Sequence, residues 1–218
     1  MSLQLPPPTD PRERLLLAAE ELFAAKGFDG ATVREICDRA GMNGAAVNYH
    51  FRDKESLYVE AVRNAHATTT GKTGEFAPVP DAALPAAERL RLFIRGMVSH
   101  MVGPARPCAV QLLMRELGAP SDAARSVVDD FIRPAADGLF AILGELLPDV
   151  GAQERLMVGY SVVGQCLYYR QNRAVCEMLH GADTVAGLTP DLVARHVTRF
   201  TLAALGLADP YPSAGEKS

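Results

Sequence analysis

A sharp turn between two short helices is the feature that most constrains how this chain can fold. Thr32 and Glu35 have the spacing of a capping box, in which each side chain bonds the backbone amide of the other residue at a helix start. Ile36 and Ala40 continue one apolar face, because residues four apart are neighbours on a helix. Gly41 stands where a helix ends in a left-handed residue, which glycine adopts without a clash at Cβ. The pattern predicts a short helix that begins at Thr32 and ends at Gly41.

The helical pattern resumes only two residues after this turn. Met42 and Asn43 are followed by the small residues 44–46 and then by the mixed apolar and polar run 47–51. Two short helices joined this tightly form a helix-turn-helix, whose second helix can enter the major groove of DNA. We therefore predict that the chain binds double-stranded DNA. The alternative is an ordinary helical hairpin whose polar side chains lie on a solvated face.

The second helix carries the candidate DNA contacts. Small residues at Gly44 and Ala45 allow its backbone to approach the floor of the groove. Asn48 can pair with adenine, and Tyr49 can reach a phosphate or a thymine methyl group. Asp53 is the expected cap of the next helix, and Lys54 lies in its first turn, where free amides also favour a phosphate. Asn43, as a cap that faces a phosphate, and His50, beside the DNA backbone, complete the set, whereas Val47 and Phe51 are predicted to be core residues.

Net charge argues for local rather than general attraction to nucleic acid. The chain has a formal charge of −4, and its first 66 residues hold eight Lys and Arg against ten Asp and Glu. A helix-turn-helix needs positive charge only where phosphates approach, because salt screens charges beyond roughly 10 Å. Arg12, Arg34, Arg52 and Lys54 can supply it. We expect weak non-specific binding and tight binding only at a matching site.

The rest of the chain reads as helical throughout. Asp10 and Pro11 form a strong helix start, and Gly27 ends that helix. Apolar residues at helical spacing over 90–101 give the clearest amphipathic pattern. Further helices are expected over 107–117, from Ser121 to Leu147 with a kink at Pro134, over 153–172, and from Thr189 to about Gly206.

The predicted fold is therefore all-α, because no segment alternates apolar and polar residues with enrichment in β-branched side chains. It consists of an N-terminal three-helix domain with the helix-turn-helix and a second, C-terminal helical domain. Proline, glycine and threonine mark the boundary between them. The expected segments are a flexible leader over 1–9, the DNA-binding domain over 10–66, a linker over 67–85, the second domain over 86–208 and a disordered tail over 209–218.

The run from Gly41 to Phe51, followed by Asp53-Lys54 and Leu57-Tyr58, resembles the TetR family of bacterial transcription regulators over about residues 10–66. The amino-acid sequence of residues 45–51, together with Arg106-Pro107 and residues 114–116, is similar to the CecR-like branch of this family. The resemblance implies that Thr32 and Arg34 meet a phosphate and a base edge. The family usually has a basic or polar residue at Gly44 and a bulky one at Asn48, so the base preference stays open.

The resemblance also implies a homodimer in which the last two long helices of each chain pair. The alternative is that the same small and apolar residues form a core within one chain. A dimer would place two recognition helices about one turn of DNA apart, roughly 34 Å. The candidate interface residues are Gly159, Val162, Val163, Cys166, Val197, Phe200, Thr201, Ala204 and Leu205.

A pocket for a small-molecule effector in the second domain is likewise implied by the family. Methionine and aromatic side chains suit an adaptable apolar cavity, although the same pattern also describes plain core. Arg115 and Gln165 are candidate polar anchors, and Arg115 could instead pair with Glu116 or lie on a solvated face. The candidate lining residues are Phe93, Met97, Met101, Met114, Arg115, Phe131, Gln165 and Tyr169.

Signals for catalysis or cofactors are weak. Residues 159–164 have one residue too many for a G-x-S-x-G nucleophile elbow and follow no strand. Cys176 and His180 could share a metal, but two ligands without a third favour a structural cysteine. Four scattered cysteines, with no secretory signal pattern and no membrane-spanning run, indicate a reduced, cytoplasmic location. We expect no enzymatic activity, catalytic residue, cofactor or metal.

These patterns together predict a ligand-responsive transcriptional repressor. It would bind a palindromic operator as a homodimer and leave it when an effector binds. A transcriptional activator is the first alternative, and a helical adaptor or enzyme with an incidental helix-turn-helix is the second. The CecR-like resemblance suggests control of a transport or drug-tolerance operon, and the effector, operator and regulated genes stay open.

Overall fold

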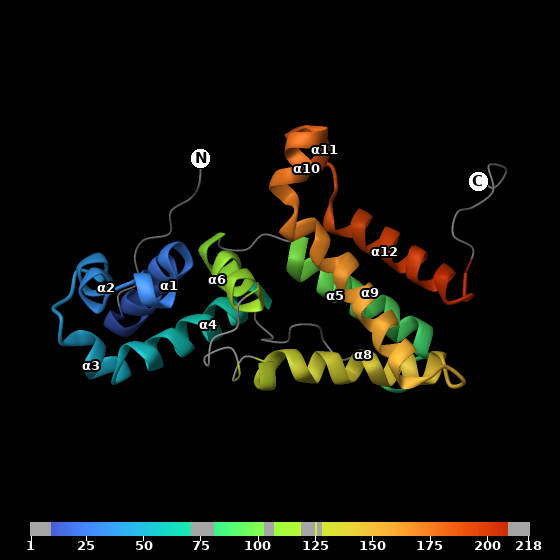
Figure 1. Ribbon diagram of the computed structural model, residues 1–218, viewed down its shortest axis with the longest axis horizontal. Helices are drawn as coiled ribbons and strands as arrows, with labels where there is room; N and C mark the ends of the chain where they lie inside the picture. The colour runs from blue at the N-terminus through green and yellow to red at the C-terminus, as the bar shows by residue number, and fades with distance from the viewer. Residues whose placement is uncertain (1–9, 71–80, 103–106, 119–124, 126–127, 209–218) are drawn as a thin grey trace. The chain divides into compact units, whose positions relative to one another are not determined.

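The computed structural model of the chain describes residues 10–70, 81–102, 107–118, 125 and 128–208. Every regular element within these ranges is helical (Figure 1), which confirms the predicted all-α class. The contacts divide the chain into two units. Unit 1 comprises residues 1–74 and 105–130, and unit 2 comprises residues 75–104 and 131–218.

Unit 1 holds the helix-turn-helix. Its core is built from apolar side chains on one face of each helix, including Leu15, Phe23, Ile36, Val47 and Leu57, all of which are fully buried. Val47 and Phe51 are buried as predicted. The helices are α1 (Pro11–Gly30), α2 (Val33–Ala40), α3 (Ala46–Phe51), α4 (Lys54–Thr70) and α6 (Pro107–Gly118).

The first helix begins and breaks where the sequence predicts. The Asp10 carboxylate accepts a hydrogen bond from the Arg12 amide at 3.1 Å, and Pro11 occupies the first helical turn. Gly27 has φ of 75°, which interrupts the helix near its end. The break turns the chain toward α2.

Helix α6 packs against α1 and α4 within unit 1. The sequence analysis assigned this segment to the second domain, and the structure differs here. The Arg115 guanidinium donates to the Ala24 carbonyl at 3.3 Å, and Tyr58 donates to the buried Glu116 carboxylate. These long-range bonds tie α6 to α1 and α4.

Unit 2 has its own apolar core. The faces of α5, α8, α9 and α12 supply it, with Phe93, Leu139, Val162 and Val197 at its centre. The helices are α5 (Ala86–Val102), α8 (Arg133–Leu146), α9 (Ala152–Gln171), α10 (Arg173–His180), α11 (Ala182–Ala186) and α12 (Pro190–Ala204), with a π-helical turn η1 (Val128–Ile132) before α8.

In unit 2 a side-chain cap starts α12, whereas α8, α9, α10 and α11 begin without one. The Thr189 hydroxyl accepts from the Leu192 amide at 3.3 Å and starts α12. The long helix predicted through Pro134 is instead a π-helical turn followed by α8, with Pro134 in the first turn. Ser121, the leader, most of the linker and the tail lie outside the described residues. The sequence analysis did not predict α10 and α11.

A search of the described helices found none with the length and apolar character needed to cross a membrane.

Candidate nucleic-acid interface

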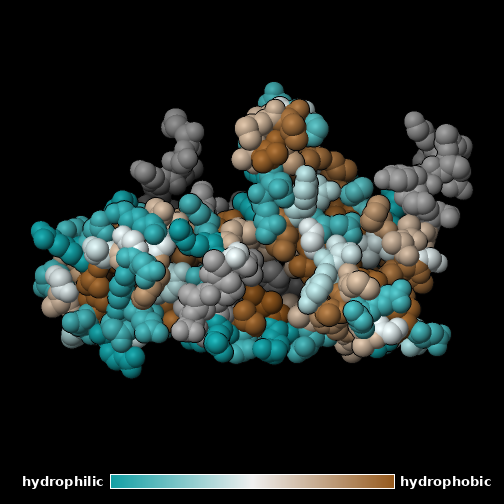
Figure 2. Space-filling view, in the orientation of Figure 1, coloured by the Kyte–Doolittle hydropathy of each residue, from teal (hydrophilic) through white to brown (hydrophobic). Residues whose placement is uncertain are grey.

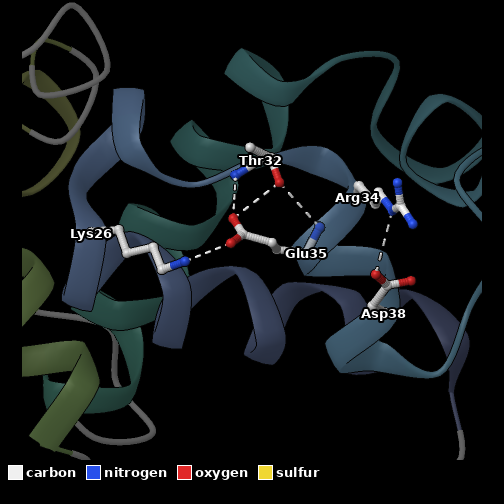
Figure 3. Close-up of polar contacts among 5 residues, drawn as sticks. All are labelled: Lys26, Thr32, Arg34, Glu35 and Asp38. Carbon is white, nitrogen blue, oxygen red and sulfur yellow. Dashed lines mark hydrogen bonds and ion pairs between the residues drawn. The ribbon is translucent and has the colours of Figure 1, made fainter.

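The capping box at the start of α2 forms as predicted (Figure 3). The Thr32 hydroxyl accepts from the Glu35 amide at 3.2 Å, and the Glu35 carboxylate accepts from the Thr32 amide at 3.0 Å. The same carboxylate receives the Lys26 ammonium at 2.5 Å. The bond from Lys26, followed by those from Thr32, lowers the pKa of Glu35 from 4.5 to about 2. The Thr32 hydroxyl, a predicted phosphate contact, is therefore engaged in the cap.

The turn between α2 and α3 depends on a left-handed glycine. Gly41 has φ of 67° and ψ of 39°, and the next amide, of Met42, donates to the Cys37 carbonyl at 2.9 Å. The Asn43 side chain then accepts from the Ala45 amide at 3.1 Å. This bond closes a turn before α3, whose N-cap position is Ala45 and has no side-chain cap bond, so the prediction that Asn43 caps this helix is wrong.

Helix α3 presents a polar face to solvent. Tyr49 is 85% exposed, Asn48 is also exposed and His50 is half-buried. Ala46 lies on the buried side with the core residues. Gly44 and Ala45 precede the helix and are exposed, and no heavy atom lies within 4 Å of a Cβ built on Gly44. A partner surface can therefore approach the backbone closely at this point.

The corner between α3 and α4 holds an unusual backbone. Arg52 has φ of 72°, the one positive φ of a non-glycine residue in the described part of the chain. Its guanidinium lies 2.9 Å from the Asp53 carboxylate, which also accepts from the Ser56 amide at 2.7 Å. Bonds from Ser56, then from Arg52, lower the pKa of Asp53 from 3.8 to about 2. Asp53 thus caps α4 as predicted.

Two open grooves flank α3 within unit 1. One, of about 520 Å³, runs between α3, α4 and Arg12, and the other, of about 490 Å³, is bounded by Arg14 and the Gly41 turn. Tyr49 and His50 border both grooves. Arg12 was predicted as a source of positive charge. Arg14 was not predicted, because nothing in the sequence around it distinguishes it from other residues of the first helix.

The cationic side chains of unit 1 differ in their exposure and in the groups that they contact. Arg34 is 91% exposed, with Asp38 at 3.9 Å. Arg12 stacks on the Phe51 ring and reaches Glu60 at 3.1 Å. The Lys54 ammonium lies 4.4 Å from the centre of the Phe28 ring, which orients it beside the start of α4. Several charged groups are thus held near the exposed face of α3.

The structure does not gather the predicted effector residues into one described site. Met114 and Arg115 belong to unit 1, where Arg115 lies against Gly27 and bonds Ala24. Gln165, which was predicted to be a polar anchor for the effector, donates to the Ser161 carbonyl of its own helix at 3.2 Å. Phe93, Met97 and Met101 are buried in unit 2, Tyr169 is half-buried beside its core, and the Phe131 side chain lies outside the described residues.

Most of the predicted dimer residues are core residues, which corrects that prediction. Val162, Cys166 and Val197 are at most 1% exposed, because their faces of α9 and α12 pack on other helices of the same chain. Thr201 is buried, and Gly159 abuts the Phe140 ring. Of the other four, Phe200 and Ala204 are exposed, whereas Val163 and Leu205 are partly buried.

Apolar side chains do reach the surface of unit 2 at neighbouring positions. Met157, Tyr160 and Tyr168 are exposed on α9, and Leu192 and Phe200 on α12. Figure 2 also shows hydrophobic surface over α10 and α11, where Met178 and Leu179 of α10 are exposed. Of these exposed residues of α9 and α12, only Phe200 was among the predicted interface residues.

Cys166 is buried, which raises its pKa to about 12, so its thiol stays neutral. The four cysteines are free. In the described ranges, no group of three or more His, Cys, Asp or Glu side chains could hold a metal, and Cys176 has no such set around it.

Comparison with known proteins gives two family matches. Residues 15–61 match the model of the bacterial regulatory proteins of the tetR family, and residues 86–205 match the C-terminal domain of the HTH-type transcriptional dual regulator CecR. The resemblance stated from the sequence is confirmed for both parts. These families are transcription regulators and not enzymes, in agreement with the prediction.

Individual relatives match the N-terminal part. The chain is 39% identical over 56 residues to the HTH-type transcriptional repressor AcnR of Corynebacterium glutamicum, which covers 26% of this chain and 30% of AcnR. It is 37% identical over 75 residues to the HTH-type transcriptional activator FasR of Mycolicibacterium smegmatis, which covers 29% of this chain and 34% of FasR. The chain thus matches about a third of the length of these relatives.

The whole fold also has solved counterparts. The structure of AibR in complex with isovaleryl coenzyme A and operator DNA is similar with a TM-score of 0.61, at 19% identity, over 92% of this chain and 99% of that one. Such identity indicates a shared fold only. Because the CecR model spans more than half of the chain and the tetR model spans its helix-turn-helix, the chain belongs to the TetR family of bacterial regulatory proteins.

Proposed function

We propose that the chain is a ligand-responsive transcriptional repressor that binds a palindromic operator as a homodimer and is released by a small-molecule effector. One observation carries this proposal. Asn48 and Tyr49 are exposed on α3, while the Gly41 turn before this helix and the Asp53 cap of α4 after it fix its two ends.

The proposed DNA contacts divide by chemistry. Asn48 and Tyr49 read base edges, because an amide can pair with adenine and an aromatic ring can contact a thymine methyl group. Gly44 and Ala45 permit close approach. Arg34 reaches a base edge from α2. Thr32, Asn43, His50 and Lys54 position the helix on the phosphates, with Arg12, Arg14 and Arg52 added from the geometry around α3.

The proposed dimer uses the exposed faces of α9 and α12. Met157, Tyr160 and Tyr168 recur at helical spacing on α9, and Leu192 and Phe200 do so on α12. Exposed apolar faces of this kind favour association with a second copy, and a twofold pair presents two recognition helices to two half-sites.

The effector part of the proposal rests on the relatives. AibR was solved with isovaleryl coenzyme A and operator DNA, so a similar fold can accommodate both kinds of ligand. An effector would act by binding more tightly to a dimer whose recognition helices no longer match the half-sites. A bacterial protein that binds an operator works in the cytoplasm, so this proposal also places the protein there.

The test is selection of bound duplexes from a random pool, followed by affinity measurement on the best sequence. We expect a twofold-symmetric sequence with half-sites one helical turn or a multiple apart. Tyr49→Ala should weaken its binding by about tenfold or more, since one base contact contributes about 1–3 kcal/mol. Met178→Ala, which removes another exposed side chain, serves as the control and should bind normally.

Two results would contradict the proposal. Selected duplexes without symmetry would remove the dimeric operator, and full affinity of Tyr49→Ala would remove α3 as the reading helix. Effectors are then sought among small molecules, isovaleryl coenzyme A first, by release of the selected duplex.

Activation is the second candidate, because FasR is an activator and matches the same region. A reporter gene placed behind the selected duplex distinguishes the two. Expression that falls when the protein is supplied supports repression, whereas expression that rises supports activation.

A further inference from the structure

A groove of about 640 Å³ runs along unit 2 between α5 and α12. Its walls come from Glu88 to Arg95 on α5 and from Asp191 to Leu202 on α12. The volume falls within the range of small-molecule sites, roughly 300–1,000 Å³. All of it lies within one unit, so its geometry is set by the packing of these two helices.

Four arginines line this groove. Arg91 and Arg95 stand four residues apart on α5, and Arg195 and Arg199 stand four apart on α12. Residues at this spacing share one face of a helix, so each helix contributes a pair of guanidinium groups. The two pairs face the same open space.

The acidic residues in the groove neutralise only half of this charge. Glu88 lies 3.2 Å from Arg91, and Asp191 lies 3.7 Å from Arg95. Arg195 and Arg199 have no ion-pair partner within the described ranges and are exposed. The groove therefore carries two unmatched positive charges in a chain whose net charge is −4.

Arg95 joins the two helices through its ion pair with Asp191, whereas Arg195 and Arg199 take no part in the ion pairs of the described residues. The contact between α5 and α12 is made by buried apolar side chains such as Phe93 and Val197. Like charges four residues apart on a helix are mildly destabilising. A bound anion would offset that repulsion.

The groove also has an apolar floor. Ala194 and Leu202 are nearly buried at its base, and Leu92 borders it. A floor of this kind suits a ligand that has a carbon skeleton beside its charged group. The carboxylates of Glu88 and Asp191 flank the arginines, and they disfavour a continuous polyanion that would extend past them.

We propose that this groove binds a phosphate-bearing small molecule, with Arg195 and Arg199 as its main ligands. Two unmatched charges equal the charge of one phosphate dianion, and the guanidinium fork binds phosphate oxygens in a bidentate manner. The site is separate from the candidate DNA contacts of unit 1 and does not depend on the proposed repressor function.

The test is calorimetric titration of the full chain with inorganic pyrophosphate in about 150 mM NaCl. At this salt concentration the Debye length is about 8 Å, so attraction between distant exposed charges is screened. The wild-type protein should bind one equivalent per chain. Arg195→Gln with Arg199→Gln should weaken binding by about tenfold for each arginine, as expected for charge-assisted hydrogen bonds. The control is Arg133→Gln with Arg173→Gln, which removes the same charge from exposed positions elsewhere in unit 2.

The proposal is overturned if the wild-type protein does not bind pyrophosphate, or if the Arg195 and Arg199 variant binds as well as the wild type. Equal loss in the control variant would show general charge attraction and would also overturn it. A final arm adds a duplex of random sequence. Displacement of pyrophosphate by this duplex would assign the groove to DNA, whereas retained binding supports a small-molecule site.

Discussion

Arg52 holds a backbone conformation that ordinary side chains avoid. Its positive φ places it in a region that costs an L-residue about 1–3 kcal/mol. The Arg52 side chain is 85% exposed at the corner between α3 and α4. We interpret the strain as the cost of turning the chain sharply into α4 while a cation stays at the corner.

This strain can be measured with two variants that both remove the guanidinium. Arg52→Gly should be more stable to urea than Arg52→Ala by about 1 kcal/mol, because only glycine tolerates the positive φ. Both should weaken binding of the selected duplex to a similar extent. Equal unfolding free energies for the two variants would mean that the backbone relaxes and stores no strain.

At the scale of the helix, the first turns of α2 and α4 are stabilised by the carboxylates of Glu35 and Asp53, which have low pKa values. The pKa of Glu35 is about 2 in the folded protein against 4.5 for the free group. The folded state therefore binds fewer protons than the unfolded state between these values, so the stabilisation is present above pH 4.5 and is lost as the pH falls toward 2.

Glu35→Gln tests this pH dependence. Glutamine retains an oxygen for the cap but has no charge to attract Lys26. The thermal midpoint of the wild type should fall more than that of the variant between pH 5 and pH 3. Parallel curves over this range would exclude Glu35 as a source of acid sensitivity, and Asp53→Asn provides the matched measurement at α4.

Close packing of α8 and α9 depends on Gly159. A Cβ at this position would lie 2.6 Å from the Phe140 ring, whereas a Cβ at Gly144 would meet no heavy atom within 4 Å. Gly159→Ala should therefore lower the unfolding free energy by about 1 kcal/mol through overpacking. Gly144→Ala should raise it by up to about 1 kcal/mol through helix propensity. Urea denaturation measures both changes. A higher unfolding free energy for Gly159→Ala would show that the Phe140 ring moves aside.

At the scale of the whole molecule, the proposed dimer depends on apolar side chains that remain exposed in one chain. Phe200 is 52% exposed on α12. Phe200→Glu should leave the fold intact but place a charge in the interface, so light scattering should give a mass near the 23.4 kDa of one chain. The selected duplex should then bind much more weakly.

The control for this experiment is Gln153→Glu, which adds the same charge to an exposed polar position of α9. It should keep the mass of the wild type. A Phe200→Glu protein that stays dimeric would place the interface elsewhere, with exposed Met178 and Leu179 of α10 as the next surface to change.

The accuracy of the sequence predictions also changes with scale. The cap at Thr32, the left-handed Gly41, the cap at Asp53 and the buried Val47 were all predicted, because each depends on residues within a few positions. Arg115 was predicted as an effector anchor, yet it bonds a carbonyl 91 residues away. Its own neighbours in the sequence contain no sign of that partner.

The sequence by itself determined that the chain is helical, where most helices begin and end, and that a helix-turn-helix lies near its start, since caps, turns and periodicity are local properties. Only the tertiary structure decided which faces of α9 and α12 are buried, that α6 packs on α1 and α4, and that four arginines line one groove. These outcomes depend on contacts between distant segments. An apolar residue on a helix can bury itself against its own chain or against a partner, and its sequence pattern is the same in both cases.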